Sequence, residues 1–227
     1  MSTTEPQMQR TTEQPEILAR GPWALEQIRA NWLDERFEPP QSHAEAADAA
    51  IAALRERGSP SHDGVSARLV DYRETADGGI ELDLQPLRWA LRLVEGDASH
   101  SVAALCVTRA ADGRWLAGRR APWLSSWAGR WALGAGGAVD LGESPADTLT
   151  RELWEEWSVT PARVRGEALI RLPHGMVMFV GQAWLAPGAE VVRDHEHDEH
   201  AWWPSEIEQW PAEAGESLPR MARWLAE

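Results

Sequence analysis

The sequence contains no lysine, one cysteine, one tyrosine and two phenylalanines. We attribute the missing lysine to a compositional bias and not to chemistry, since arginine supplies all 22 basic residues. A single cysteine excludes an intramolecular disulfide. The apolar neighbours of Cys106 favour a buried thiol over a nucleophile.

Long apolar runs are also missing, and this bears on where the protein acts. No run approaches the roughly 18 residues that a membrane-spanning helix needs. The first 16 residues lack the basic end and the apolar centre of a signal peptide. We therefore expect a cytoplasmic protein with no membrane partner.

Basic residues are scarce relative to acidic ones, 22 against 36, which gives a formal net charge of −14. Such a field repels polyanions, so the composition argues against a nucleic acid polymer as partner. A small phosphorylated molecule stays compatible, because local arginines or a metal ion can hold it. With 227 residues, 43% of them hydrophobic, the chain can bury one good core and a small second one.

The pattern of apolar residues divides the chain into a tail and two units. Residues 1–16 are polar and are predicted to be a disordered tail. Residues 17–95 are predicted to form a small α+β domain, with helices over 21–33 and 42–58 and a β-hairpin over 66–87. The acidic stretch VEGDASH marks the boundary to the next unit.

Residues 96–227 are predicted to form a second, larger domain. Two β-rich runs joined by an Asp-Gly turn precede a clear helix that begins at Pro145. More strand-like runs lie between residues 168 and 204, and an amphipathic helix closes the chain. Strands on both sides of a central helix predict a mixed sheet between helices, an α/β (α+β) arrangement.

The helix that begins at Pro145 carries a concentration of negative charge. Ser144 is placed to cap it, and Glu152, Glu155 and Glu156 follow on one helical face. Carboxylates at this spacing repel one another, so a divalent cation such as Mg²⁺, which prefers oxygen ligands, is expected among them. An isolated cluster of this kind is more often a solvated acidic face, and the wider context decides between the two interpretations.

Around this helix, chemically distinctive residues recur at fixed spacings. The specified positions are Gly137, Glu143, Arg151, Glu152, Leu153, Glu155, Glu156 and Val159. The series resembles the signature of the Nudix hydrolase family, G-x5-E-x7-R-E-U-x-E-E-x-G-U, in which U is aliphatic. Over residues 96–227 this resemblance implies a Nudix α/β/α sandwich with a mixed sheet, preceded here by the small α+β domain.

The resemblance also implies a reaction and residues that carry it. The reaction is hydrolysis of a nucleoside diphosphate linked to another moiety, by attack of water on phosphorus. Arg151 would orient Glu152, a candidate general base, and Glu143 would hold the loop and the helix in register. The implied ligands of Mg²⁺ or Mn²⁺ are the backbone carbonyl of Gly137 and the carboxylates of Glu152, Glu155 and Glu156.

One specified position departs from the signature, because Ser158 replaces its last glycine. That glycine follows the helix end, where a left-handed conformation is common, so the course of the exit loop is in question. The metal-binding face lies one turn earlier, and we do not expect an inactive enzyme. Thiamine-diphosphatase-like Nudix proteins, which carry a small N-terminal domain and tend to lack this glycine, resemble the chain more loosely.

Outside the signature, residues 113–131 combine four tryptophans with several arginines. A tryptophan in a strand is more often core packing, although its face can also stack on a planar ring. We expect Arg119 or Arg120 to touch the substrate, and we assign Trp131 to substrate binding as well.

A second acidic stretch, residues 193–203, holds His195, His197 and His200 among four acids. We favour a solvated loop over a transition-metal site. Glu199 is assigned as a further metal ligand, because in some Nudix proteins a carboxylate from a neighbouring loop reaches the metal.

The sequence thus predicts a metal-dependent hydrolase of a diphosphate linkage in a nucleoside diphosphate derivative or a similar small molecule. The alternative is a catalytically weak ligand-binding or regulatory protein that keeps the metal site. The signature does not choose the substrate. The N-terminal unit and exposed tryptophans offer surfaces for a homodimer.

Overall fold

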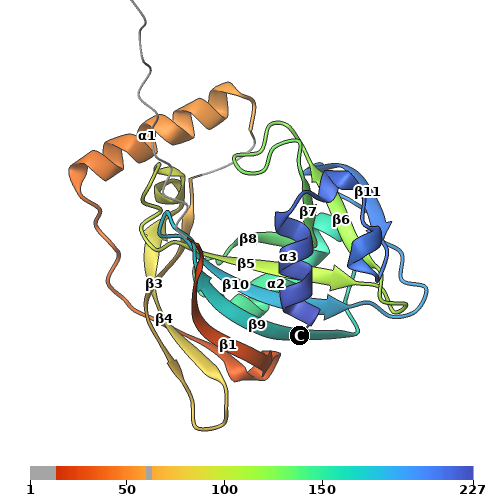
Figure 1. Cartoon of the computed structure of the whole chain (residues 1–227). Helices are drawn as coiled ribbons and strands as arrows, with labels where there is room; N and C mark the ends of the chain where they lie inside the picture. Colours follow the sequence, from red (N-terminus) through yellow and green to blue (C-terminus); the bar gives the residue numbers. More distant parts are fainter. Residues whose placement is uncertain (1–13, 60–62, 227) are drawn as a thin grey trace, which may run out of the picture.

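The computed structural model describes residues 14–59 and 63–226 of the chain. The predicted tail at residues 1–16 therefore lies mostly outside the described residues. Within the described part, the chain forms two β-sheets and three α-helices (Figure 1). No helix of that part is long and apolar enough to cross a membrane.

The larger sheet has eight strands, and their directions are mixed. Its main order is β1-β9-β10-β5-β6-β11, with β8 paired to β5 and β7 paired to β6. β10 runs parallel to β5, whereas the other pairs are antiparallel. The strands are β1 (Glu16–Ala24), β5 (Val102–Arg109), β6 (Trp115–Arg120), β7 (Trp131–Leu133), β8 (Ala135–Ala138), β9 (Arg163–Arg171), β10 (Val177–Trp184) and β11 (His197–Trp203).

Two helices cover opposite faces of this sheet (Figure 1). α2 (Pro145–Trp157) buries Leu149 and Leu153 in the core on one face. α3 (Ser217–Ala226) buries Ala222 in the core on the other face. Successive residues of each strand point to opposite faces, so the same strands line both cores. The predicted α/β/α sandwich with a mixed sheet is confirmed.

A second, three-stranded sheet precedes these elements in the chain. β4 (Ile80–Arg88) lies in its middle, parallel to β2 (Ile28–Trp32) and antiparallel to β3 (Val65–Glu74). This confirms the predicted β3–β4 hairpin. α1 (Gln41–Glu56), predicted over 42–58, packs on η2 (Trp89–Leu93) in a third, small core.

The helix predicted over residues 21–33 is wrong. β1, the 3-10 helix η1 (Leu25–Gln27) and β2 occupy this segment. Trp23 and Ile28 are buried because β1 pairs with β9 and β2 pairs with β4, and such pairing outweighs a local apolar pattern. Since β1 lies in the larger sheet, the division of the chain into domains at residue 95 stays a prediction.

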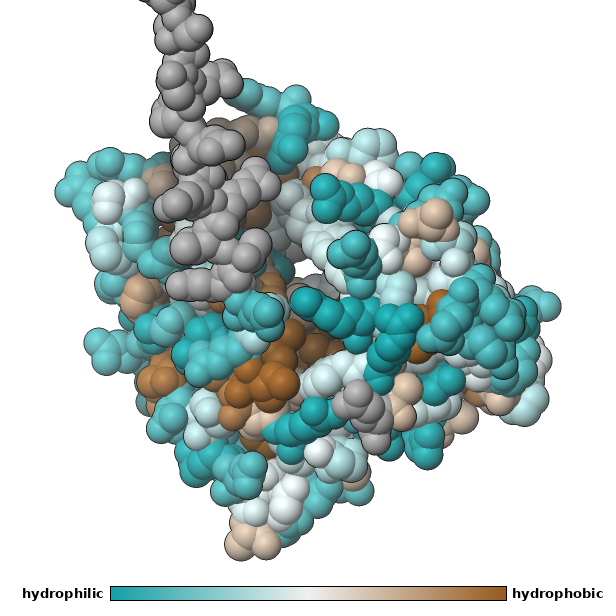
Figure 2. Space-filling view, viewed as in Figure 1, coloured by the Kyte–Doolittle hydropathy of each residue, from teal (hydrophilic) through white to brown (hydrophobic). Residues whose placement is uncertain are grey.

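Viewed from the same side as Figure 1, the surface is largely hydrophilic, and apolar side chains gather over β1 and β3 (Figure 2). Ile17 of β1 is 50% exposed and Val70 of β3 is 48% exposed. The predicted homodimer remains a prediction, because apolar exposure alone does not name a partner.

Candidate active site

The N-terminus of α2 is built as its sequence predicts. The hydroxyl of Ser144 accepts a hydrogen bond from the backbone N–H of Asp147 at 3.3 Å. In return, the Asp147 carboxylate accepts one from the backbone N–H of Ser144 at 2.8 Å. Pro145 takes the first helical position, where no backbone donor is needed. This reciprocal cap fixes the start of the helix that carries the glutamates.

The other end of α2 shows what the serine at the signature's last glycine does. Ser158 is exposed and takes the left-handed conformation, with φ 50° and ψ 37°. Its backbone N–H donates to the carbonyl of Trp154 at 2.8 Å. The helix therefore ends in the conformation that glycine would adopt, at a cost of about 1 kcal/mol.

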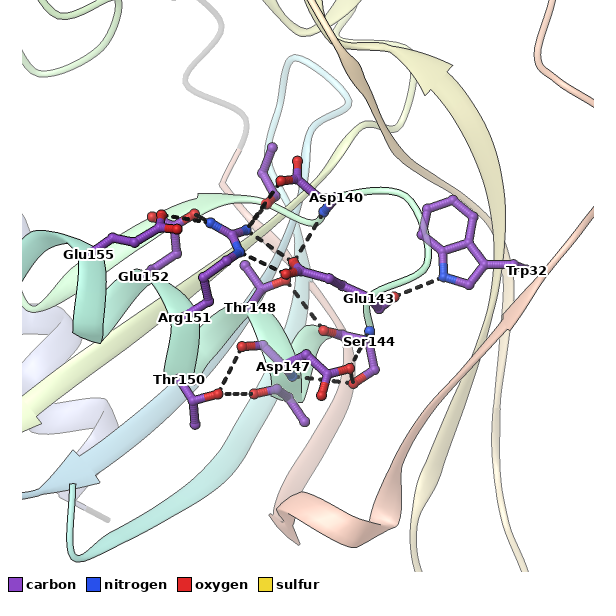
Figure 3. A network of polar contacts seen from close by, with 12 residues as sticks. Trp32, Asp140, Glu143, Ser144, Asp147, Thr148, Thr150, Arg151, Glu152 and Glu155 are labelled. Atoms are coloured by element: carbon purple, nitrogen blue, oxygen red, sulfur yellow. Dashed lines mark hydrogen bonds and ion pairs between the residues drawn. The ribbon is translucent and has the colours of Figure 1, made fainter. Parts of the chain in front are cut away.

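Arg151 is the centre of the polar network that Figure 3 shows. Its guanidinium donates to the Glu143 carboxylate at 2.7 and 3.0 Å, to Glu152 at 2.7 Å and to Glu155 at 3.0 Å. It also donates to the carbonyl of Ala138 at 3.0 Å. Burial disfavours the charge of Arg151, but these hydrogen bonds and the charges of Glu143 and Glu152 outweigh it and raise its pKa.

Glu143 joins the loop before α2 to the helix itself. Besides the Arg151 bonds, its carboxylate accepts a hydrogen bond from the hydroxyl of Thr148 at 2.7 Å and one from the backbone N–H of Asp140 at 3.3 Å. Burial raises the pKa of Glu143, but these donors lower it by more, so the net shift is downward and the group stays ionised.

Glu152 lies against the backbone of Gly137 in β8. A Cβ atom at position 137 would stand 2.1 Å from Glu152 Oε1, so a side chain there would displace the Glu152 carboxylate. Burial raises the pKa of Glu152 to about 7, although Arg151 lowers it in part, and the charges of Glu155 and Glu196 raise it further. A carboxyl group with this pKa is able to exchange a proton near neutral pH.

Glu156 is the most deeply buried of the three glutamates, with 3% of its surface exposed. Its Oε1 accepts a hydrogen bond from the backbone N–H of Gly136 at 2.9 Å. Its Oε2 has no hydrogen-bond partner in the described structure and lies 3.6 Å from Nε2 of His197, an atom equally without a partner. Burial first, and then the charge of Glu152, raise the pKa of Glu156 well above its ordinary value.

Glu155 completes the acidic face and differs from its neighbours, because it is exposed and contacts Arg151. Among residues 14–59 and 63–226, no group of three or more His, Cys, Asp or Glu side chains is already gathered closely enough to hold a metal ion. The three carboxylates share one region of α2, but Arg151 stands between Glu152 and Glu155.

The predicted substrate contacts on β6 separate to opposite faces of the sheet. Arg120 lies on the α2 face, where its charge acts on Glu156 and its guanidinium is 3.8 Å from the Glu196 carboxylate. Arg119 points to the other face and contacts Glu199 at 3.4 Å. Glu199, predicted as a metal ligand, is thus exposed beside Arg119 instead of beside the α2 glutamates.

Trp131 lies on the same face as Arg119 and packs at 5.5 Å, ring centre to ring centre, from Trp203. Trp131 and Arg119 line a cavity of about 750 Å³. The other lining residues are Trp127, Gly129, Arg130, Glu213, Ala214, Gly215 and Ser217.

Three residues that the sequence did not predict to act on the glutamates lie near them. Glu196 and Arg92 act electrostatically on Glu152, and burial lowers the pKa of Arg92 although the charge of Glu152 opposes this. His197 is 1% exposed and packs on Trp157, 4.5 Å between ring centres, so a solvated loop was the wrong interpretation for this residue.

Comparison of the sequence with models of known protein families finds a match. The sequence model of the NUDIX domain matches residues 99–225. A comparison with curated proteins finds no match.

Three solved structures are similar to about half of this chain, each with a TM-score below 0.5. The MutT protein from Methanosarcina mazei Go1 is 25% identical, with a TM-score of 0.43 over 56% of this chain and 95% of its own. The NUDIX domain of Shewanella oneidensis NrtR, complexed with ADP ribose, is 21% identical, with a TM-score of 0.44 over 56% of this chain and 89% of its own. The C. elegans Ap4A hydrolase is 18% identical, with a TM-score of 0.43 over 56% and 95%.

Proposed function

Since the chain belongs to the Nudix hydrolase family, we propose that it hydrolyses a diphosphate linkage in a small molecule with the help of Mg²⁺ or Mn²⁺. The observation that carries this proposal is the Oε2 atom of Glu156, which is buried without a hydrogen-bond partner among the described residues. A buried carboxylate oxygen without a partner is costly unless a cation or a proton meets it. Two further glutamates on the same helix make a cation the better match.

The donors around this atom suit a hard divalent cation. Glu152, Glu155, Glu156 and the carbonyl of Gly137 offer oxygen atoms only, which Mg²⁺ and Mn²⁺ prefer. From the loop before β11, we propose Glu196 as a supporting carboxylate in preference to Glu199, because its charge already acts on Glu152 and Glu156.

The side chains also divide the chemical work. When bound, the cation neutralises charge on the diphosphate oxygens and acidifies a water molecule. Glu152 is the candidate to accept the proton. Arg151 orients Glu152 through their 2.7 Å hydrogen bond. Arg120, on the α2 face, is placed to bind a phosphate oxygen by a charge-assisted hydrogen bond.

Because β6 ends at Arg120, we propose that the substrate passes this strand end, so that the group attached to the diphosphate binds at the cavity that Arg119 and Trp131 line on the other face. Its volume of about 750 Å³ is within the range of small-molecule sites. Arginine and tryptophan side chains together suit a planar or anionic group. These two side chains therefore favour a nucleoside-like substituent over an aliphatic one.

The test is a panel of diphosphate compounds, incubated with Mg²⁺ and with Mn²⁺, and analysed for the phosphorylated products. We expect turnover of at least one nucleoside diphosphate derivative, dependent on the cation. Binding of panel compounds with no turnover of any would favour the alternative, a regulatory protein that keeps the site.

A comparison of Arg120→Ala with Arg119→Ala tests how the two faces divide substrate recognition. Arg120→Ala is expected to lower kcat/KM by about 10- to 100-fold for every cleaved compound, since a hydrogen bond to a charged group contributes about 1.5–3 kcal/mol. Arg119→Ala should change KM only for compounds whose substituent reaches the cavity. Equal losses of kcat/KM in both variants, whatever group is attached to the diphosphate, would contradict this division between the two faces.

A further inference from the structure

The three-stranded sheet touches the loop of the signature, although β2, β3 and β4 all lie outside residues 99–225. The backbone N–H of Ala67 in β3 donates to the carbonyl of Val139 at 2.8 Å. The next contact is an isolated antiparallel bridge between Ser66 and Asp140. The loop that connects β8 to α2 is therefore held by strands from another part of the chain.

β2 makes a second contact with the same loop through one side chain. The indole Nε1 of Trp32 donates to the backbone carbonyl of Glu143 at 2.8 Å, as Figure 3 shows. Trp32 is half-buried and its ring packs against the core beneath α2. Glu143 is thus held at its backbone by Trp32 and at its carboxylate by Arg151.

This arrangement links Trp32 to the glutamates in two steps. Arg151 is fixed by the two hydrogen bonds that it donates to Glu143, and it also donates to Glu152 and Glu155. Within the loop, the backbone N–H of Glu143 donates to the carbonyl of Asp140 at 3.0 Å, whereas Leu141 is 56% exposed and Gly142 takes φ 89°. A loop of this kind samples many conformations unless contacts from outside restrict it.

We propose that the three-stranded sheet positions the signature loop for cation binding, with Trp32 as its positioning residue. The inference rests on the proposed function, since it concerns the same glutamates. It gives the N-terminal part of the chain a role in the site without direct contact to substrate or cation. In this proposal Trp32 acts through its indole N–H and not through the bulk of its ring.

The test compares Trp32→Phe with a matched control, Trp210→Phe. Trp210 is also half-buried and also donates from Nε1 to a backbone carbonyl, that of Pro204, at 2.8 Å. Both substitutions remove one indole N–H and keep an aromatic ring. The probe is Mn²⁺ alone, with its affinity measured by electron paramagnetic resonance of the free ion, and hydrogen exchange of residues 138–143 is followed in the same samples.

Trp32→Phe is expected to weaken Mn²⁺ binding by about 5- to 10-fold, toward the lower end of effects from residues that support metal ligands. Exchange in residues 138–143 should quicken, and saturating Mn²⁺ should restore kcat. Trp210→Phe should change neither affinity nor exchange.

Three results would overturn the inference in distinguishable ways. If Trp32→Phe and Trp210→Phe bind Mn²⁺ as tightly as the wild type, the positioning role is wrong while the proposed function stands. If exchange quickens and affinity is unchanged, the contact is structural only. If the wild type itself does not bind Mn²⁺, the cation site fails and the inference fails with it.

Discussion

Replacing Glu156 by Gln is expected to reduce turnover by at least about 100-fold while the protein stays folded. The substitution keeps the shape of the side chain but removes the charge that faces the cation, and loss of a ligand should exceed the 10- to 100-fold effects of supporting residues. In the metal-free protein the change removes a buried group whose charged form is disfavoured, so the free energy of unfolding should not fall.

Glu167→Gln provides the control for this variant. Glu167 of β9 is half-buried and contacts Arg165 and Gln182. It lies beside α3, on the face of the sheet opposite to the α2 glutamates. Turnover, Mn²⁺ affinity and melting temperature are measured for both variants. Full activity of Glu156→Gln, with Mn²⁺ affinity unchanged, would remove Glu156 from the cation site.

The parts of the site that sequence alone predicts are those encoded by neighbouring residues. The cap at Ser144 depends on Asp147, three positions away, and the acidic face of α2 depends on helical spacing. The left-handed Ser158 follows from its place directly after the helix end. In each case the residues that interact are fixed by the local backbone.

The parts that sequence does not predict depend on contacts between distant segments. β1 and β2 have apolar residues at helical spacing, but their partners β9 and β4 lie far along the chain. Arg92 reaches the glutamates from η2, and Glu196 and His197 reach them from the start of β11. The opposite orientation of Arg119 and Arg120 was predictable, since neighbours in a strand point to opposite faces.

The raised pKa of Glu152 is expected to have a second large effect, which is on the stability of the metal-free protein. Its pKa in the folded protein is about 7, raised from an ordinary value of 4.5, so the folded state binds the proton more tightly. Its contribution to stability is therefore fully present below pH 4.5 and is lost as the pH rises through 7. The loss amounts to about 3 kcal/mol, or roughly 6–12 °C in melting temperature for a chain of this size. Glu156, whose pKa is also raised, acts in the same direction.

The measurement that isolates this effect is the difference between the wild type and Glu152→Gln, melted without metal from pH 5 to pH 8. The difference is needed because His100 and His174, whose pKa values burial lowers, stabilise the fold as the pH rises through 6.5 and partly mask the trend. The wild type should lose more stability than Glu152→Gln over this range, and Mn²⁺ should raise its melting temperature more at pH 8 than at pH 5. Parallel curves would mean that Glu152 ionises at an ordinary pKa in the metal-free protein, which would contradict the expected loss of stability.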